Sequence, residues 1–200
     1  MKPELTTLRE QMVRAARRAY ESGLQSGNGG NLSARVPGEQ IVLIKPSGTS
    51  FGEITRENLV AVDFEGRVIE GSGRPSRELQ THLEIYRLRS DVHGILHSHS
   101  PWAIACAQLF SELPLHTYHA RDKVGEIPIL DVEGHADEQV VAGVKALLDE
   151  NPDVKAFVQR RHGIFAMAED IVTAEHHAEL VEETAQIAWL VRGDEDGRRR

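Results

Sequence analysis

The chain has 200 residues, 40% of them hydrophobic, with a formal net charge of −8 and one cysteine, Cys106. The length suits a single domain with a substantial core, the lone cysteine excludes an internal disulfide, and the acidic balance argues against general nucleic-acid binding. The apolar runs are too short to span a membrane and the N-terminal segment lacks signal-peptide features, so we expect a cytoplasmic protein with neither a nucleic-acid nor a membrane partner.

The first half of the chain predicts one helix followed by strands in hairpins. Residues 5–22 carry apolar side chains at helical spacing, and Gly23 ends that pattern. The glycine-rich run that follows, residues 26–31, is a loop. Strands are predicted at residues 32–36, 41–45, 59–64 and 67–69, with turns at residues 37–38 and 65–66 and a polar loop at residues 46–49.

The second half predicts helices alternating with strands. Helices are expected at residues 76–89 and at residues 136–149. Two more are expected to begin at Pro101, with Ser100 as N-cap, and at Ile171, with Asp170 as N-cap and Gly193 as the stop. Strands are expected at residues 94–99, 127–132 and 154–168, the last broken at residues 161–163. This order predicts one α/β domain over residues 1–193, with a mostly antiparallel sheet covered by helices and a charged tail at 194–200. No G-x-G-x-x-G or P-loop pattern is present, which disfavours a nucleotide-binding fold.

His97 and His99 are the most informative residues for function. Side chains two apart on a strand point to the same face, so these two imidazoles project together from a strand end and could share one Zn²⁺ or similar ion. His162 lies between two predicted strands, where a polar turn residue needs no function. Glu78 lies in the opening turn of a helix, where a carboxylate complements the helix dipole, but one facing the histidines could bind metal or accept a proton.

Five motifs occur in the order and spacing of the class II aldolases: residues 28–33, residues 45–48, residues 75–78, the pair His97 and His99, and His162 with Gly163. The chain therefore resembles the class II aldolase/adducin-head family over nearly its whole length. It looks like the branch that contains L-fuculose-1-phosphate aldolase and L-ribulose-5-phosphate 4-epimerase. The resemblance implies a three-layer α/β/α sandwich with a central, mostly antiparallel mixed sheet.

The resemblance also implies a role for individual residues. His97, His99 and His162 would hold one Zn²⁺ per subunit, with Mn²⁺ or Co²⁺ as alternatives, and Glu78 would bind the resting metal and then act as base. Tyr118 would reach a neighbouring subunit's site as proton donor, in a homotetramer with sites at subunit interfaces. The residues expected to bind the sugar phosphate are Asn28, Gly30, Asn31, Ser47, Gly48, Ser76 and Arg77.

The activity that the resemblance implies is retro-aldol cleavage of a phosphorylated ketose through a Zn-stabilised enediolate, in carbohydrate metabolism. Arg77 departs from the sugar-phosphate aldolases, which carry a small hydroxyl residue there, and resembles the branch that decarboxylates 3-oxo-tetronate 4-phosphates. A sugar-phosphate 4-epimerase is a third reading, with Asp122 as the nearest extra proton-transfer group. A non-catalytic adducin-like domain is the fourth, although adducin heads lack the metal ligands that this chain retains.

Overall fold

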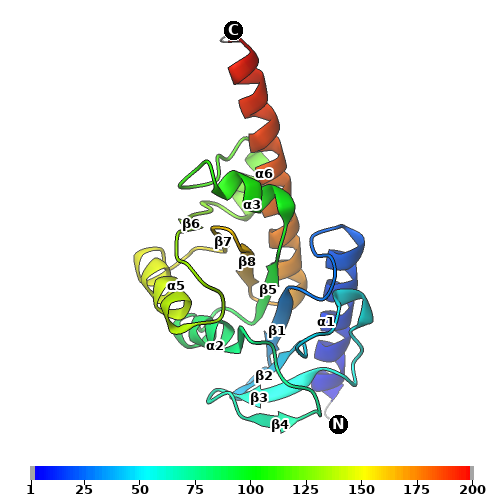
Figure 1. Cartoon of the computed structure of the whole chain (residues 1–200). Helices are drawn as coiled ribbons and strands as arrows, with labels where there is room; N and C mark the ends of the chain where they lie inside the picture. Colours follow the sequence, from blue (N-terminus) through cyan, green and yellow to red (C-terminus); the bar gives the residue numbers. More distant parts are fainter. Residues whose placement is uncertain (1–2, 199–200) are drawn as a thin grey trace.

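The computed structural model describes residues 3–198 and forms one eight-stranded mixed sheet. Along the sheet the strands run in the order β4-β3-β2-β1-β5-β8-β7-β6 (Figure 1). All neighbours are antiparallel except β6 and β7, so the sheet is mostly antiparallel as the sequence predicted. The strands are β1 (Asn31–Arg35), β2 (Ile41–Ile44), β3 (Val60–Asp63), β4 (Val68–Glu70), β5 (Gly94–Ser98), β6 (Ile129–Leu130), β7 (Ala156–Gln159) and β8 (Gly163–Ala168).

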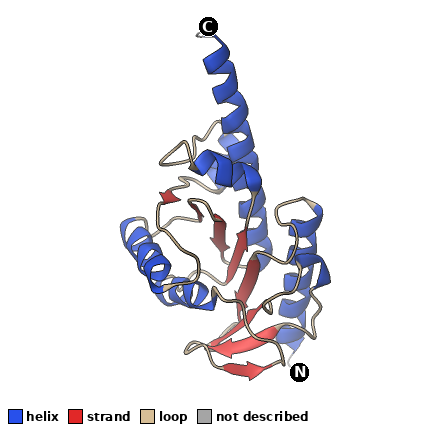
Figure 2. Ribbon diagram, in the orientation of Figure 1, coloured by secondary structure: helices blue, strands red, loops and turns tan. Residues whose placement is uncertain are grey.

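Helices cover both faces of the sheet and complete three layers (Figure 2). The helices are α1 (Pro3–Glu21), the short 3₁₀ helix η1 (Phe51–Glu53), α2 (Leu79–Leu88), α3 (Pro101–Ala107), α4 (Tyr118–Lys123), α5 (Glu138–Glu150) and α6 (Ile171–Arg198). Helices α1, α3 and α6 pack on one face, and α2 and α5 pack on the other. Alternate residues of a strand face opposite sides of the sheet and so pack in different cores. Leu43 of β2 packs in the core beneath α1, α3 and α6, whereas its neighbours Val42 and Ile44 pack in the core beneath α2 and α5.

Helix α6 lies against the centre of the sheet through small side chains. Ala174, Ala178 and Ala185 recur at helical spacing and are fully buried, which lets the helix backbone approach β5 and β8 closely. Asp170 caps the start of this helix as predicted, because its Oδ1 accepts from the backbone N–H groups of Val172 and Thr173, both at 2.8 Å.

Two predicted helix boundaries were wrong. The helix expected from Ser76 begins at Leu79, because residues 76–78 form a turn in which the Ser76 hydroxyl accepts from the backbone N–H of Glu78 at 3.3 Å. Helix α6 does not stop at Gly193 but runs to Arg198, across the expected domain boundary, and residues 199–200 lie outside the described part. A glycine inside a helix costs only about 1 kcal/mol relative to alanine, so it does not end a helix by itself.

The turn after β5 is anchored to Leu24 and to helix α6. Ser100 is the N-cap of α3 as predicted, but its hydroxyl donates to the Leu24 carbonyl rather than accepting from the helix. Glu182 of α6 takes over the capping, with its carboxylate accepting from the N–H groups of Trp102 at 2.9 Å and Ala103 at 2.8 Å. The end of β5, which carries the paired histidines, is therefore fixed against α6.

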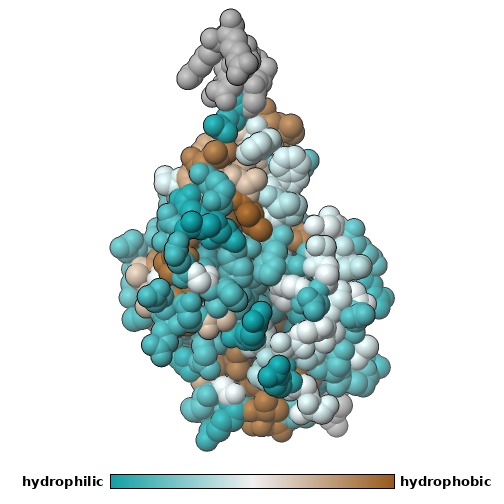
Figure 3. Space-filling model, in the orientation of Figure 1, coloured by the Kyte–Doolittle hydropathy of each residue, from teal (hydrophilic) through white to brown (hydrophobic). Residues whose placement is uncertain are grey.

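The face of the molecule in Figure 3 is mostly hydrophilic, with apolar atoms gathered on the upper part of α6. There Trp189, Leu190 and Val191 remain 40%, 61% and 36% exposed. Within residues 3–198, no helix combines the length and the apolar character needed to cross a membrane.

Candidate metal centre and adjoining pocket

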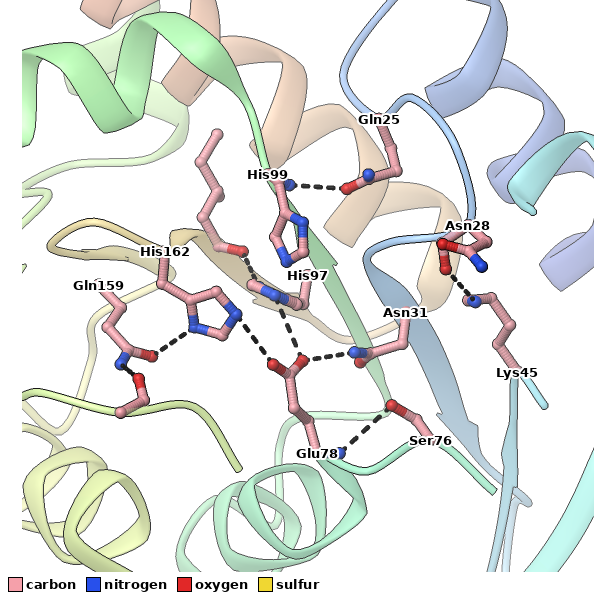
Figure 4. Close-up of polar contacts among 12 residues, drawn as sticks. Gln25, Asn28, Asn31, Lys45, Ser76, Glu78, His97, His99, Gln159 and His162 are labelled. Carbon is pink, nitrogen blue, oxygen red and sulfur yellow. Dashed lines mark hydrogen bonds and ion pairs between the residues drawn. The ribbon is translucent and has the colours of Figure 1, made fainter. Parts of the chain in front are cut away.

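Three histidines from two separate parts of the chain meet at one end of the sheet (Figure 4). His97 and His99 come from the end of β5, and His162 comes from the turn that enters β8. Each offers a ring nitrogen that lies within 4.8 Å of the nitrogens of the other two. The predicted convergence of His162 with the histidine pair is therefore observed, at a spacing that suits one shared metal ion.

Hydrogen bonds fix which nitrogen of two of these rings is free. The Nδ1 of His97 lies 2.8 Å from the Ile164 carbonyl, which can only accept, so Nδ1 carries the proton. The Nδ1 of His162 lies 2.9 Å from Oε1 of Gln159, whose amide nitrogen donates to the Gly134 carbonyl at 2.8 Å. Gln159 thus presents an acceptor, and His162 is likewise protonated at Nδ1. With the proton on Nδ1, Nε2 is the ring nitrogen that can bind a metal in both residues.

Glu78 completes the cluster from the N-terminal end of α2. Its Oε1 lies 3.0 Å from Nε2 of His162, and its Oε2 lies 3.2 Å from Nε2 of His97 and 2.5 Å from the side-chain nitrogen of Asn31. The Nε2 of His97 is buried and has no hydrogen-bond partner among the described residues. Two imidazole lone pairs facing a carboxylate repel it, and a cation between them removes the repulsion. This donor set fits a divalent metal such as Zn²⁺.

The pKa values of the cluster favour binding of such an ion. Burial lowers the pKa of His97 to about 3, and burial also lowers the pKa of His99, so both rings are neutral donors near pH 7. Burial by itself raises the pKa of Glu78, but the contacts with His97 and His162 and the hydrogen bond from Asn31 outweigh it and hold the pKa below its usual range.

A pocket of about 340 Å³ opens beside the histidines and contains every predicted substrate-binding residue. Its lining includes Asn28, Gly30, Asn31, Ser47, Gly48, Ser76, Arg77 and Glu78, together with His99 and His162. Gly30 lies where no other residue fits: its φ is +60°, and a Cβ would lie 2.6 Å from Oε1 of Gln25 and 2.7 Å from the His97 carbonyl oxygen. The glycine-rich loop therefore packs directly on the strand that carries the metal ligands.

Lys45 was not predicted as a site residue, although it belongs to one of the family motifs. It is only 2% exposed, and its ammonium donates to the carbonyls of Asn28, at 3.3 Å, and Thr49. These bonds tie the glycine-rich loop to the loop after β2, and burial lowers the pKa of Lys45 to about 8. A lysine at the end of an apolar strand was the signal available in the sequence.

Four more residues of the site were not assigned from the sequence: Gln25, Arg74, His135 and Gln159. Arg74 and His135 line the pocket, and the His135 ring centroid lies 6.0 Å from that of His162. Gln25 accepts from the backbone N–H of His99 at 2.7 Å. Glutamines and arginines in loops carry no distinctive local pattern, so only their positions in the folded chain identify them.

Tyr118 lies outside this pocket. It is 80% exposed at the start of α4 and does not line the cavity beside the histidines. Asp122 of the same helix is also exposed and outside the pocket. The prediction that Tyr118 serves a neighbouring subunit's site concerns an assembly of several chains and stays a prediction.

The fold and the site together define an α/β protein with a candidate three-histidine metal centre. Residues 10–189 match the model of the Class II Aldolase and Adducin N-terminal domain, so the chain belongs to that family. Its fold is similar to a solved L-fuculose 1-phosphate aldolase, at 29% identity over 94% of this chain and 87% of that one, with a TM-score of 0.85. The L-fuculose-1-phosphate aldolase of Thermus thermophilus is similar at 27% identity over 94% and 96% of the two chains, with a TM-score of 0.83. YgbL of Escherichia coli, described as a putative aldolase, epimerase or decarboxylase, matches at 27% identity over 94% and 90%, with a TM-score of 0.84.

Proposed function

We propose that the protein is a metal-dependent lyase that cleaves a phosphorylated ketose by a retro-aldol reaction. The observation that carries this proposal is the buried Nε2 of His97, which has no hydrogen-bond partner in the described part of the chain and faces the Glu78 carboxylate beside His99 and His162. These histidines would hold Zn²⁺, or Mn²⁺ or Co²⁺, which the same donors also accept. The bound ion would supply a Lewis acid that polarises the hydroxy-ketone.

The pocket loops would bind the phosphate of the substrate. Ser47 and Gly48 on one side and Asn28 and Gly30 on the other offer hydroxyl, amide and backbone N–H donors around one cavity. Lys45 joins the two loops through the Asn28 and Thr49 carbonyls, which supports their acting together as the proposed phosphate site. The substrate carbonyl is then directed toward the histidines.

Proton transfers at the two reacting atoms complete the cleavage. The hydroxyl of the departing aldehyde loses a proton, and the carbon left behind gains one. Glu78 lies at the pocket wall beside the metal ligands, where its carboxylate would take a proton from that carbon in the condensation direction and, once protonated, would return it in the cleavage direction. In the proposed homotetramer, Tyr118 of a neighbouring subunit exchanges the proton at the aldehyde oxygen.

The test is cleavage of L-fuculose 1-phosphate, followed through the dihydroxyacetone phosphate released, with metal content measured on the same sample. We expect activity that EDTA abolishes and Zn²⁺ restores, and a loss of metal and activity in His97→Ala. The matched control is His177→Ala, because His177 is also buried but its ring hydrogen-bonds the Met167 carbonyl, away from the pocket beside the histidines. Protein without bound divalent metal, or activity indifferent to EDTA, would rule out the metal-dependent mechanism.

The second candidate is decarboxylation of a phosphorylated 3-oxo sugar acid on the same site. Arg77 and Arg74 both line the pocket, so two guanidinium groups that can each bind a carboxylate or a phosphate by paired hydrogen bonds adjoin the candidate metal centre. Release of CO₂ from a 3-oxo-tetronate 4-phosphate, with no aldehyde product, would favour this reaction. Arg77→Ser should then raise KM at least about tenfold while metal content is unchanged, and unaltered kinetics would exclude the carboxylate-binding role.

A further inference from the structure

A series of buried polar contacts joins β1 to α2 behind the Glu78 carboxylate, and we call it the β1–α2 ladder. Its members are Asn31, Ser33 and Arg35 on β1 and Glu78, His82 and Tyr86 on the α2 side. The Ser33 hydroxyl lies 2.7 Å from Nδ1 of His82 and 2.9 Å from the Tyr86 hydroxyl. Arg35 donates to the Tyr86 carbonyl, and its guanidinium lies 5.1 Å from the centre of the Tyr86 ring. The first contact of the ladder is the Asn31–Glu78 hydrogen bond drawn in Figure 4.

The contacts of the ladder recur at regular intervals because the two-residue repeat of the strand and the four-residue repeat of the helix have nearly equal lengths. Alternate residues of a strand share one face and lie about 6.6 Å apart. Every fourth residue of a helix shares one face and lies about 6 Å further along the axis. Residues 31, 33 and 35 therefore stay in step with residues 78, 82 and 86, and sliding either element breaks all the contacts together.

The polar residues of β1 differ from the residues of its neighbour β2 on this face of the sheet. The neighbouring strand β2 contributes Val42 and Ile44 to the same core, and the strand beyond it contributes only apolar residues there as well. Ser33 and His82 are fully buried, and Nε2 of His82 has no hydrogen-bond partner among the described residues. A buried group with an unmet hydrogen bond lowers stability, so packing alone does not account for His82.

We propose that Ser33 and His82 are positioning residues that hold the Glu78 carboxylate in front of the metal-binding histidines. Glu78 is the N-cap of α2, and its side chain makes no capping hydrogen bond to the helix; the local contact from Ser76 holds its backbone N–H and not its carboxylate. The contacts at Ser33 lock α2 against β1, and this lock keeps Glu78 within reach of Asn31 and His162. The positional claim stands on geometry, and its catalytic consequence rests on the proposed function.

The deciding experiment is a crystal structure of Ser33→Ala, which removes one oxygen atom at the centre of the ladder. We expect the Glu78 carboxylate to move beyond hydrogen-bond distance of Asn31 or His162. With L-fuculose 1-phosphate as probe, kcat should fall about tenfold while KM stays within about twofold. Thr184→Val is the matched control, since it removes a buried hydroxyl from α6 and should change neither the Glu78 position nor kcat.

A second pair of variants separates positioning from simple loss of packing. His82→Asn keeps a polar group near the position of Nδ1 and should retain more of kcat than His82→Leu, although both alter the volume of the side chain. If Glu78 keeps its contacts in Ser33→Ala, or if the two His82 variants lose kcat equally, the positioning role is wrong. A wild-type protein inactive on L-fuculose 1-phosphate would instead count against the proposed function, and the crystal structure would still decide the positional claim.

Discussion

Gln159 is the residue that we expect to tune metal affinity without touching the metal. It is fully buried on β7, accepts from Nδ1 of His162 at 2.9 Å and donates to the Gly134 carbonyl at 2.8 Å. Replacing it with leucine keeps most of its volume and removes both bonds. The Nδ1–H of His162 then loses its acceptor, and the ring is free to move its proton to Nε2, the atom that must bind the ion.

The expected size of the effect follows from the contacts that remain. His97 keeps its bond to the Ile164 carbonyl, and His99 is unaffected, so two of the three ligands stay oriented. Loss of one orienting partner of a metal-bound histidine typically weakens metal binding by roughly 10- to 100-fold. This range corresponds to about 1.4 to 2.7 kcal/mol, so Gln159→Leu should weaken the site and His97→Ala should abolish it.

The assay is competition for Zn²⁺ against a chromophoric chelator, with Gln108→Leu as control. Gln108 is an exposed glutamine whose amide donates only within its own helix, to the Ile104 carbonyl. We expect the zinc dissociation constant of Gln108→Leu to equal that of the wild type. An unchanged dissociation constant in Gln159→Leu would refute the argument that Gln159 fixes the metal-binding tautomer of His162.

Two further predictions concern stability. Gly27 and Gly30 have φ values of +62° and +60°, so alanine at either costs about 1 to 2 kcal/mol, but only at Gly30 would the new Cβ meet other atoms. In denaturant melts Gly30→Ala should therefore lose about 1 to 3 kcal/mol more than Gly27→Ala, and equal losses would contradict this. Burial and the neighbouring Glu179 raise the pKa of Glu175 from 4.5 to about 8. Between these two pH values the folded state holds a proton that the unfolded chain releases. The contribution of Glu175 to the free energy of unfolding therefore falls as pH rises through this interval. Glu175→Gln should flatten that decline in melts at several pH values across this interval, and an unchanged slope would show that Glu175 is not its source.

Patterns among neighbouring residues were enough to predict the local structure that builds the sheet. The hairpin about Glu65 and Gly66 and the helix capped by Asp170 are confirmed, because alternation, turn residues and caps act over a few neighbouring positions. The His97 and His99 pair is also confirmed, since a period of two along a strand places both rings on one side. The helix ends at Ser76 and Gly193 were missed because such ends depend on contacts outside the local pattern.

The assembly of the site depends on contacts between residues that are far apart in the sequence. The Asn31–Glu78 bond joins residues 47 positions apart, and the His97–Ile164 bond joins residues 67 positions apart. No local pattern encodes these separations, because they follow from which strands pair and which helix packs on them. The roles of Gln25, Lys45 and Gln159 arise in the same way: each is an ordinary polar residue in the sequence, and the fold places it against a loop or a histidine that needs its hydrogen bond.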